Sequence, residues 1–213
     1  MIDYIVTGSA LGAVAALAIA VRVRRDILPQ RAFAANHGWT VLRAGTSSLR
    51  GDLADVALFQ TGHSSQLGPH FRTADGIEVF GYRYETGADR ELGLHTWRVA
   101  MSPAAHTLRA MVTTQDWLLA LADKPAAHRE ALARGPVASV AGNSRTSIVI
   151  DTDCEPRRLP RALTEALSTE PAGRTWELLP GYVVVYEPGA FREKECLALV
   201  DSARRIAPFA VAD

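Results

Sequence analysis

The N-terminal segment constrains this chain most, because it is long and apolar enough to cross a lipid bilayer. Residues 2–23 are almost all apolar or small, with Tyr4 near the start and Arg22, Arg24 and Arg25 at or just beyond the end. A helix needs about 20 such residues, at 1.5 Å each, to cross a hydrocarbon layer about 30 Å thick. The sequence therefore predicts a transmembrane helix with Tyr4 and the arginines at the membrane interfaces.

Two other interpretations of this segment stay open. Ala18-Ile19-Ala20 has the small-x-small pattern of a signal-peptide cleavage site, but no positive charge precedes the apolar run, as a signal peptide requires. A buried core helix is the other alternative. Membrane insertion agrees best with the length of the run and its basic end.

Arginine positions predict the orientation. Arg31 adds to the basic residues that follow the span, and no Lys or Arg precedes it. Because positive flanks stay in the cytoplasm, we expect the N-terminus outside the cell membrane and residues 24–213 in the cytoplasm. Cys154 and Cys196 would then remain thiols, whereas a disulfide between them would indicate an extracytoplasmic domain.

Small residues recur along one stripe of the predicted span. Gly8, Gly12, Ala16 and Ala20 are four positions apart, so they would share one helix face. Such a face lets a second helix approach closely. We expect a helix–helix contact there, with a second copy of the chain or with another membrane subunit.

Composition argues against a nucleic-acid-binding protein. The chain has 213 residues with 23 basic and 23 acidic side chains, so its formal net charge is zero. Dedicated nucleic-acid binders usually carry a clear basic excess. Apart from the lipid bilayer, the expected partners are therefore proteins.

Turn signals and hydrophobic periodicity predict an α+β domain after the anchor. Tight turns at Asp75-Gly76 and Pro180-Gly181 indicate hairpins, because glycine tolerates a positive φ. Hairpins favour a mostly antiparallel sheet with packed helices. We divide the chain into an anchor with its cytoplasmic extension, 1–36, and a soluble domain, 37–213. Two lobes, 37–122 and 137–213, are an alternative division of the domain.

Individual segments carry more specific predictions. Helical spacing continues to His37-Gly38, where glycine ends the helix. Polar residues 60–69 indicate a loop. In the strand that follows the first hairpin turn, both faces carry apolar residues, so we expect both faces to be covered for part of its length. Amphipathic helices are expected near residues 159–167 and in the last segment, where Cys196 lies on the apolar face.

No motif predicts catalysis, a cofactor or a metal. His63 and His70 flank a polar segment near Asp55, but they lack metal-ligand spacing. Residues 151–155 are acidic but lack the pattern of an EF-hand. Tyr82-Arg83-Tyr84 is explained better by sheet packing than by base stacking, and Cys196 is expected to act as a small apolar residue.

Several short motifs occur in a recognisable order. They are an alanine-rich segment ending in Gly38-Trp39, the strand Tyr82-Arg83-Tyr84-Glu85-Thr86-Gly87, His95-Thr96, Trp176-Glu177, the valines 183–185, Pro188-Gly189 and a closing helix. In this order the chain resembles a group of single-pass membrane proteins from actinobacteria to which no activity is assigned. The resemblance implies a membrane location and a non-enzymatic role.

The leading hypothesis is a membrane-tethered cytoplasmic interaction domain, or an accessory subunit of a membrane protein complex, without catalytic chemistry. An enzyme with an unrecognised site, or a ligand-sensing domain that signals through the anchor, are the alternatives. A deep pocket with convergent polar groups would favour the enzyme.

We expect the intact chain to stay with membranes after an alkaline carbonate wash, because the anchor buries its side chains in lipid. Fractionation followed by intact-mass measurement tests this expectation. Release into the supernatant, or loss of the first twenty residues, would contradict it. A reporter fused after Asp213 tests the cytoplasmic orientation independently.

Overall fold

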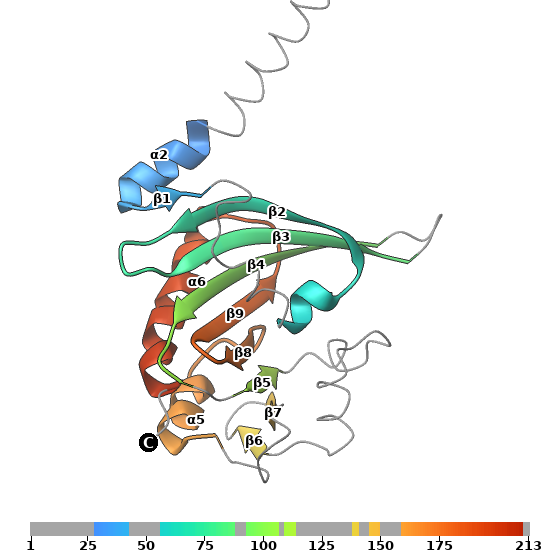
Figure 1. Cartoon of the computed structure of the whole chain (residues 1–213), viewed down its shortest axis with the longest axis vertical. Coiled ribbons are helices and arrows are strands. Elements are labelled where there is room, and N and C mark those ends of the chain that lie inside the picture. The colour runs from blue at the N-terminus through green and yellow to red at the C-terminus, as the bar shows by residue number, and fades with distance from the viewer. Residues whose placement is uncertain are drawn as a thin grey trace, which may run out of the picture.

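An antiparallel sheet of nine strands organises the part of the chain that the computed structural model describes, residues 28–42, 56–87, 93–106, 109–113, 138–140, 145–149 and 159–210 (Figure 1). Its strands are β1 (Thr40–Val41), β2 (His63–Arg72), β3 (Glu78–Thr86), β4 (Gly93–Pro103), β5 (Ala110–Thr113), β6 (Ala138–Val140), β7 (Arg145–Val149), β8 (Thr175–Leu179) and β9 (Tyr182–Pro188). The described helices are α2 (Leu28–His37), α5 (Arg161–Ser168) and α6 (Glu193–Ile206), with 3₁₀ turns η4 (Ala57–Gln60) and η5 (Ala207–Ala210). An antiparallel sheet with packed helices confirms the α+β class.

The strand order is β1-β2-β3-β4-β9-β8-β5-β7-β6. Both predicted hairpins form, with Gly76 and Gly181 at φ values of 86° and 85°. The β8–β9 hairpin lies between β4 and β5, so strands from residues 37–122 and 137–213 share one sheet. Figure 1 shows this hairpin at the centre of the sheet.

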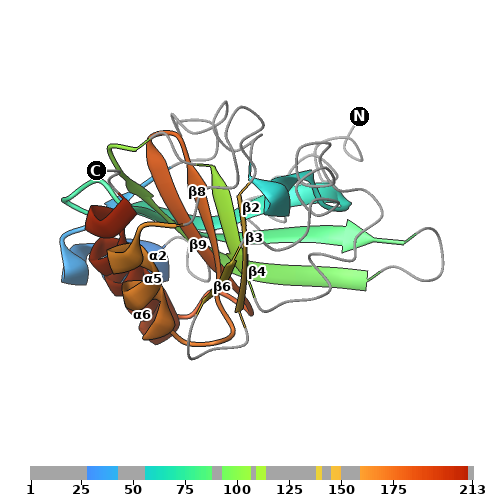
Figure 2. The same cartoon turned by 90° about the horizontal axis from the view of Figure 1, so that it is seen from below.

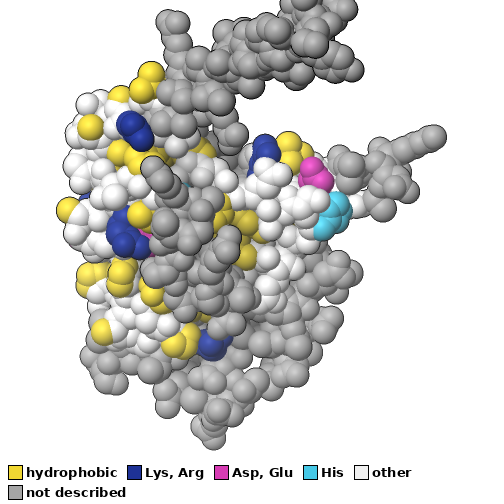
Figure 3. Space-filling model, turned by 45° about the horizontal axis from the view of Figure 1, so that its top comes forward, with side chains coloured by type: hydrophobic (Ala, Val, Ile, Leu, Met, Phe, Trp, Pro, Cys, Tyr) yellow, Lys and Arg dark blue, Asp and Glu magenta, His cyan; other side chains and the backbone are white. Residues whose placement is uncertain are grey.

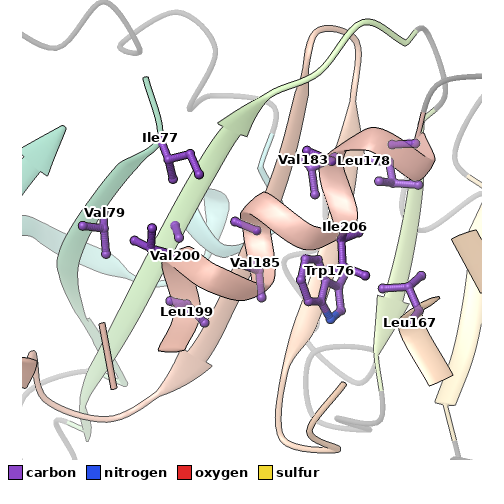
Figure 4. Packing of buried hydrophobic residues seen from close by; sticks show 14 of the residues in the cluster. Ile77, Val79, Leu167, Trp176, Leu178, Val183, Val185, Leu199, Val200 and Ile206 are labelled. Atoms are coloured by element: carbon purple, nitrogen blue, oxygen red, sulfur yellow. The ribbon is translucent and has the colours of Figure 1, made fainter. Parts of the chain in front are cut away.

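Helices α2, α5 and α6 cover one face of the sheet (Figure 2). Helix α6 packs on β4 and β9 and contacts α5. Figure 4 shows Leu199, Val200 and Ile206 of α6 beside the inward side chains of the central strands, which include Val185 and Trp176. We call this the helix-covered face.

The sequence of α6 explains why it is a helix. Cys196, Leu199, Val200, Ala203 and Ile206 recur at three- and four-residue spacing, and all are buried. Acidic side chains occupy the first turn and basic side chains the last, as the helix dipole favours. The prediction that the last segment buries Cys196 on an apolar face is confirmed.

Helix α2 is attached to the sheet through an aromatic cluster. The ring of Phe33 lies 5.2 Å from Trp39 and 5.0 Å from Phe71 of β2, both edge-to-face. Phe191 completes the cluster, 5.5 Å from Phe71. Gly38, at φ 64°, follows the end of the helix, as the sequence predicts.

The prediction of a loop at residues 60–69 is wrong, because most of this segment belongs to β2. Its side chains from His63 to Gln66 are exposed, so the segment shows no alternation of apolar and polar residues. Pairing with β3 forms the strand instead, with two register shifts that a local pattern does not reveal.

Other predictions fall outside the described residues. They are the transmembrane span at residues 2–23, with its small-residue stripe and basic end, and the acidic segment 151–155. Among the helices that the structure describes, none combines the length and the apolar character that crossing a membrane requires.

We predict that Leu199→Ala lowers the free energy of unfolding by about 2–5 kcal/mol, because it leaves a cavity under α6. Leu94→Ala is the matched control: Leu94 is 62% exposed, so the same truncation should cost less than about 0.5 kcal/mol. Urea unfolding of the full chain in mild detergent measures both. Equal losses would contradict the packing described.

Candidate functional site

The face of the sheet opposite the helices combines aromatic side chains with aliphatic ones and methionines. We call it the aromatic face; its buried apolar cluster is Val56, Ala57, Leu58, Phe80, Tyr82, Tyr84, Trp97, Val99, Met101, Met111, Leu179, Val184 and Tyr186. The Tyr84 ring stacks on His95 at 5.0 Å, and Trp97 meets Tyr186 edge-to-face at 5.7 Å. The expectation that β3 is covered on both faces is confirmed for part of the strand, from Glu78 to Tyr82.

A short segment, Val56–Gly62, lies against this face, and we call it the cover segment. Val56 and Leu58 are fully buried. The ring of Phe59 packs edge-to-face on Tyr82 at 4.6 Å and stacks on Phe80 at 5.9 Å. The cover segment therefore shields aromatic side chains from solvent.

Gly62 lets the end of the cover segment approach the sheet. Its φ is 70°, a conformation that L residues rarely adopt. A Cβ atom there would lie 2.4 Å from the carbonyl oxygen of Glu85 and 2.4 Å from Cδ2 of Tyr84. Only glycine fits without displacing the segment.

Glu177 of β8 connects the cover segment to the aromatic face. Its side chain is fully buried. Tyr186 Oη donates to its Oε1 at 2.6 Å, and the backbone N–H of Ala57 donates to its two oxygens at 3.1 and 3.0 Å. The Leu58 amide is a further donor. One carboxyl group thus joins β8, β9 and η4.

Burial dominates the titration of this group. It raises the pKa of Glu177 to about 7, although the hydrogen bonds from Tyr186, Ala57 and Leu58 act in the opposite direction. Burial also raises the pKa of Tyr186 well above its ordinary value, and Glu177 adds to this effect. Of the two groups, Glu177 is therefore the one whose pKa lies near neutral pH.

A second buried carboxylate, Glu78 of β3, behaves in the opposite way. His70 Nε2 lies 2.7 Å from Oε2, and Arg72 Nε donates to Oε1 at 3.1 Å. Burial alone would raise the pKa of Glu78, but the hydrogen bonds and charges of His70 and Arg72 outweigh it and lower the pKa. Glu78 therefore remains ionised as a structural ion pair.

The two carboxylates occupy one cross-strand row. Glu78 is opposite Met101, Met101 opposite Val184, and Val184 opposite Glu177. Three strand spacings separate them, roughly 14 Å. At that distance, with apolar side chains between them, we expect each group to titrate independently of the other.

A network of charges joins α6 to β9 at the border of the helix-covered face. Glu170, whose side chain is fully buried, accepts hydrogen bonds from Arg174 at 3.1 Å, Ser202 at 2.6 Å and Arg205 at 2.9 Å. Arg174 Nε also pairs with Glu187 of β9 at 3.0 Å. Paired in this way, these charges fix the turn before β8 to α6 and have a structural role.

The structure separates the histidines singled out in the sequence. His63 Nε2 lies 2.9 Å from the Gly87 carbonyl oxygen, whereas His70 pairs with Glu78. Within the described ranges, no three His, Cys, Asp or Glu side chains group as metal ligands would. Burial raises the pKa of Cys196 to about 12, which keeps it a thiol.

Of the other residues singled out in the sequence, some lie in the aromatic face and the rest lie outside the described residues. Tyr82 and Tyr84 pack in the aromatic face, while the exposed Arg83 donates to Gln66 at 3.0 Å, so the sheet-packing interpretation is confirmed. Gly8, Gly12, Ala16, Ala20, Tyr4, Arg22, Arg24, Arg25 and Cys154 lie outside the described residues.

Sequence reasoning missed both Glu177 and Glu78. A signal for Glu78 exists: it alternates with Phe80, Tyr82 and Tyr84, so period two places it on the buried face. Glu177 stands in a strand in which every side chain is buried. A carboxylate within such a strand must have partners elsewhere in the fold.

Exposed apolar side chains are scattered. Leu28, Leu94 and Phe209 are the large apolar residues that stand out as exposed in the described part of the chain. The face seen in Figure 3 carries small groups of hydrophobic side chains interrupted by basic ones and by white polar or backbone atoms. No single large apolar surface stands out among the described atoms of that view.

Comparison with known proteins relates the fold to one solved structure. No protein-family model matches the sequence, and no curated protein gives a significant match. The fold is similar to the crystal structure of the mycobacterial trehalose monomycolate transport factor A, TtfA, with a TM-score of 0.55 and 10% sequence identity. The match covers 86% of this chain and 94% of that chain. The two proteins therefore share a fold over most of their lengths.

We predict that Gly62→Ala lowers the free energy of unfolding by about 1–3 kcal/mol, because the new methyl group meets Tyr84 and backbone in a strained conformation. Gly173→Ala is the control, since nothing lies within 4 Å of its Cβ position. Thermal or urea unfolding measures both variants. If both variants unfold like the wild type, the close approach of the cover segment is wrong.

Proposed function

We propose that this protein is a membrane-tethered accessory component of a lipid-transport system, without catalytic chemistry of its own. The observation that carries the proposal is the extent of the fold similarity to a transport factor, which spans 94% of that chain. A similarity of that extent concerns the whole architecture rather than one recurring motif. The substrate in the name of TtfA, trehalose monomycolate, is a glycolipid, so the substrate class proposed for the system served here is lipid.

The internal use of the buried acids supports a non-catalytic role. Glu78, Glu170 and Glu177 are each less than 5% exposed. All three hydrogen bond to neighbouring protein groups. A general acid or base must reach the proton that it transfers in a bound substrate. These carboxylates instead hold strands, helices and the cover segment together.

The sequence supports the tether. Under this proposal residues 2–23 span the cell membrane once with the N-terminus outside, and the sheet domain lies at the cytoplasmic surface. The stripe Gly8, Gly12, Ala16 and Ala20 would contact a helix of the transport protein. The tether thereby keeps the domain at high local concentration beside that partner.

Purification from membranes at native expression tests the proposal. We expect the full chain, extracted in mild detergent, to copurify with a polytopic membrane transport protein identified by mass spectrometry. Depletion of the chain should shift a lipid from the outer to the inner side of the membrane, measured by metabolic labelling. A strictly monomeric, unaccompanied protein, with lipid distribution unchanged on depletion, would overturn the proposal.

A matched pair of variants tests the helix contact separately. Gly8→Leu with Gly12→Leu fills the stripe and should abolish copurification. Ala10→Leu with Val14→Leu places the same two leucines on the opposite helix face and should retain it. Equal recovery of the partner with both pairs would place the contact elsewhere.

A further inference from the structure

Part of the contact between the cover segment and the sheet consists of hydrogen bonds to one carboxyl group, which can gain or lose a proton. Ala57 and Leu58 donate their backbone N–H groups to the Glu177 carboxyl, and Tyr186 donates its hydroxyl. The side chains of the segment add apolar contacts, with Phe59 on Tyr82 and Phe80. The polar part of this docking therefore depends on the state of one buried acid.

The geometry accommodates a protonated Glu177 as well as an ionised one. Oε1 lies 2.6 Å from the Tyr186 hydroxyl oxygen, which can accept a hydrogen bond as readily as donate one. A proton on Oε1 would point to Tyr186, and Oε2 would still accept from the Ala57 amide at 3.0 Å. Protonation thus removes a buried charge while the amide contacts to the cover segment remain.

We propose that Glu177 is a proton-controlled latch: a proton on this carboxyl group holds the cover segment against the aromatic face, and its loss loosens the segment. The aromatic side chains beneath, which include Phe80, Tyr82 and Tyr84, then become accessible to solvent or to another molecule. This inference depends on the sheet and the cover segment, and it holds whether or not the protein takes part in lipid transport.

Thermodynamic linkage between the protonation of Glu177 and the docking of the cover segment gives the direction of the pH dependence. With the cover segment in place, burial raises the pKa of Glu177 to about 7. When the segment lifts, water reaches the carboxyl and its pKa returns toward the ordinary value of 4.5. The state with the higher pKa binds the proton more tightly, so protonation favours the closed state. The cover segment is therefore held most strongly below pH 4.5. Its hold weakens as the pH rises from 4.5 to about 7, and it changes little above pH 7.

Among the described residues that face Glu177, the other titratable groups are tyrosines. Tyr186 of β9 donates to it directly, and Tyr84 of β3 interacts electrostatically with Tyr186, but burial raises the pKa of both tyrosines, that of Tyr84 to about 12. The segment η4 and the facing position of β5, Met111, contribute no titratable side chain. In the described part of this face, the next carboxylate is Glu78, three strands away, and its pKa is lowered.

Amide hydrogen exchange of the full chain in mild detergent measures the latch. Peptides that cover residues 56–62 are followed by mass spectrometry from pH 5 to pH 8, and rates are corrected for intrinsic chemical exchange. With pKa values of about 7 and 4.5 for the two states, protection should fall on the order of 40-fold between pH 5 and pH 7. Peptides from α6 should show no such change. If the protection of the cover segment from exchange does not change with pH, the proposal is overturned.

The Glu177→Gln variant distinguishes the latch from other pH-dependent changes in the protein. The glutamine amide can donate to Tyr186 while its carbonyl oxygen accepts from Ala57, so the variant imitates the protonated state without titrating. Its cover segment should remain protected at every pH, with no slope. Glu78→Gln, on the same row of the sheet, is the matched control and should keep the wild-type slope. A slope that persists in Glu177→Gln would assign the effect to another group and overturn the proposal.

A direct titration keeps the test decisive if Glu177→Gln does not fold. Carbon-13 NMR of the wild-type chain, labelled at the glutamate carboxyl carbons, should show one carboxyl that titrates above pH 6. Its midpoint should coincide with the upper end of the exchange transition. If every carboxyl titrates below pH 6, the latch does not exist.

Discussion

The pairing of β4 with β9 is the interaction on which the rest of this structure depends. It extends from Trp97 opposite Pro188 to Pro103 opposite Tyr182, and it joins the first four strands to the last hairpin. Strand β9 also carries both cores: Val183 and Val185 face the helices, while Val184 and Tyr186 face the other way. Because the side chains alternate, a slip of one residue in this pairing would exchange the two faces and bury the wrong set on each side.

Different interactions stabilise the packing on the two faces of the sheet. The helix-covered face relies on aliphatic packing, such as Leu199 and Val200 of α6 against the central strands, with paired charges around Glu170 at its border. The aromatic face also buries polar groups, and each buried carboxylate there must be satisfied by hydrogen bonds. Glu78 obtains an ion pair, whereas Glu177 obtains amides and a hydroxyl. This difference explains why one acid keeps its charge and the other holds a proton near neutrality.

Local patterns predict much of this fold, and contacts between distant segments account for the rest. Asp75-Gly76 and Pro180-Gly181 predicted their hairpins, and the spacing of apolar residues predicted α6 and the two faces of β3. Strand β2 was missed because its exposed side chains carry no alternation and pairing with β3 forms it. The position of β9 beside β4 and the role of Glu177 have no local signal. Ala57, which binds Glu177, is 120 residues away in sequence, so only the assembled sheet brings them together.

The aromatic cluster around Phe33 has a mechanical consequence. It fixes α2 to β2, so this helix lies beside β1, at one margin of the strand order, while β6 forms the opposite margin. Eight strand spacings separate these margins, roughly 38 Å along the sheet if it were flat. A force applied to the chain before Leu28 would therefore act at one edge of the sheet rather than at its middle. If the whole sheet rotated about β1, the strands at the far margin would therefore move much further than β1 itself.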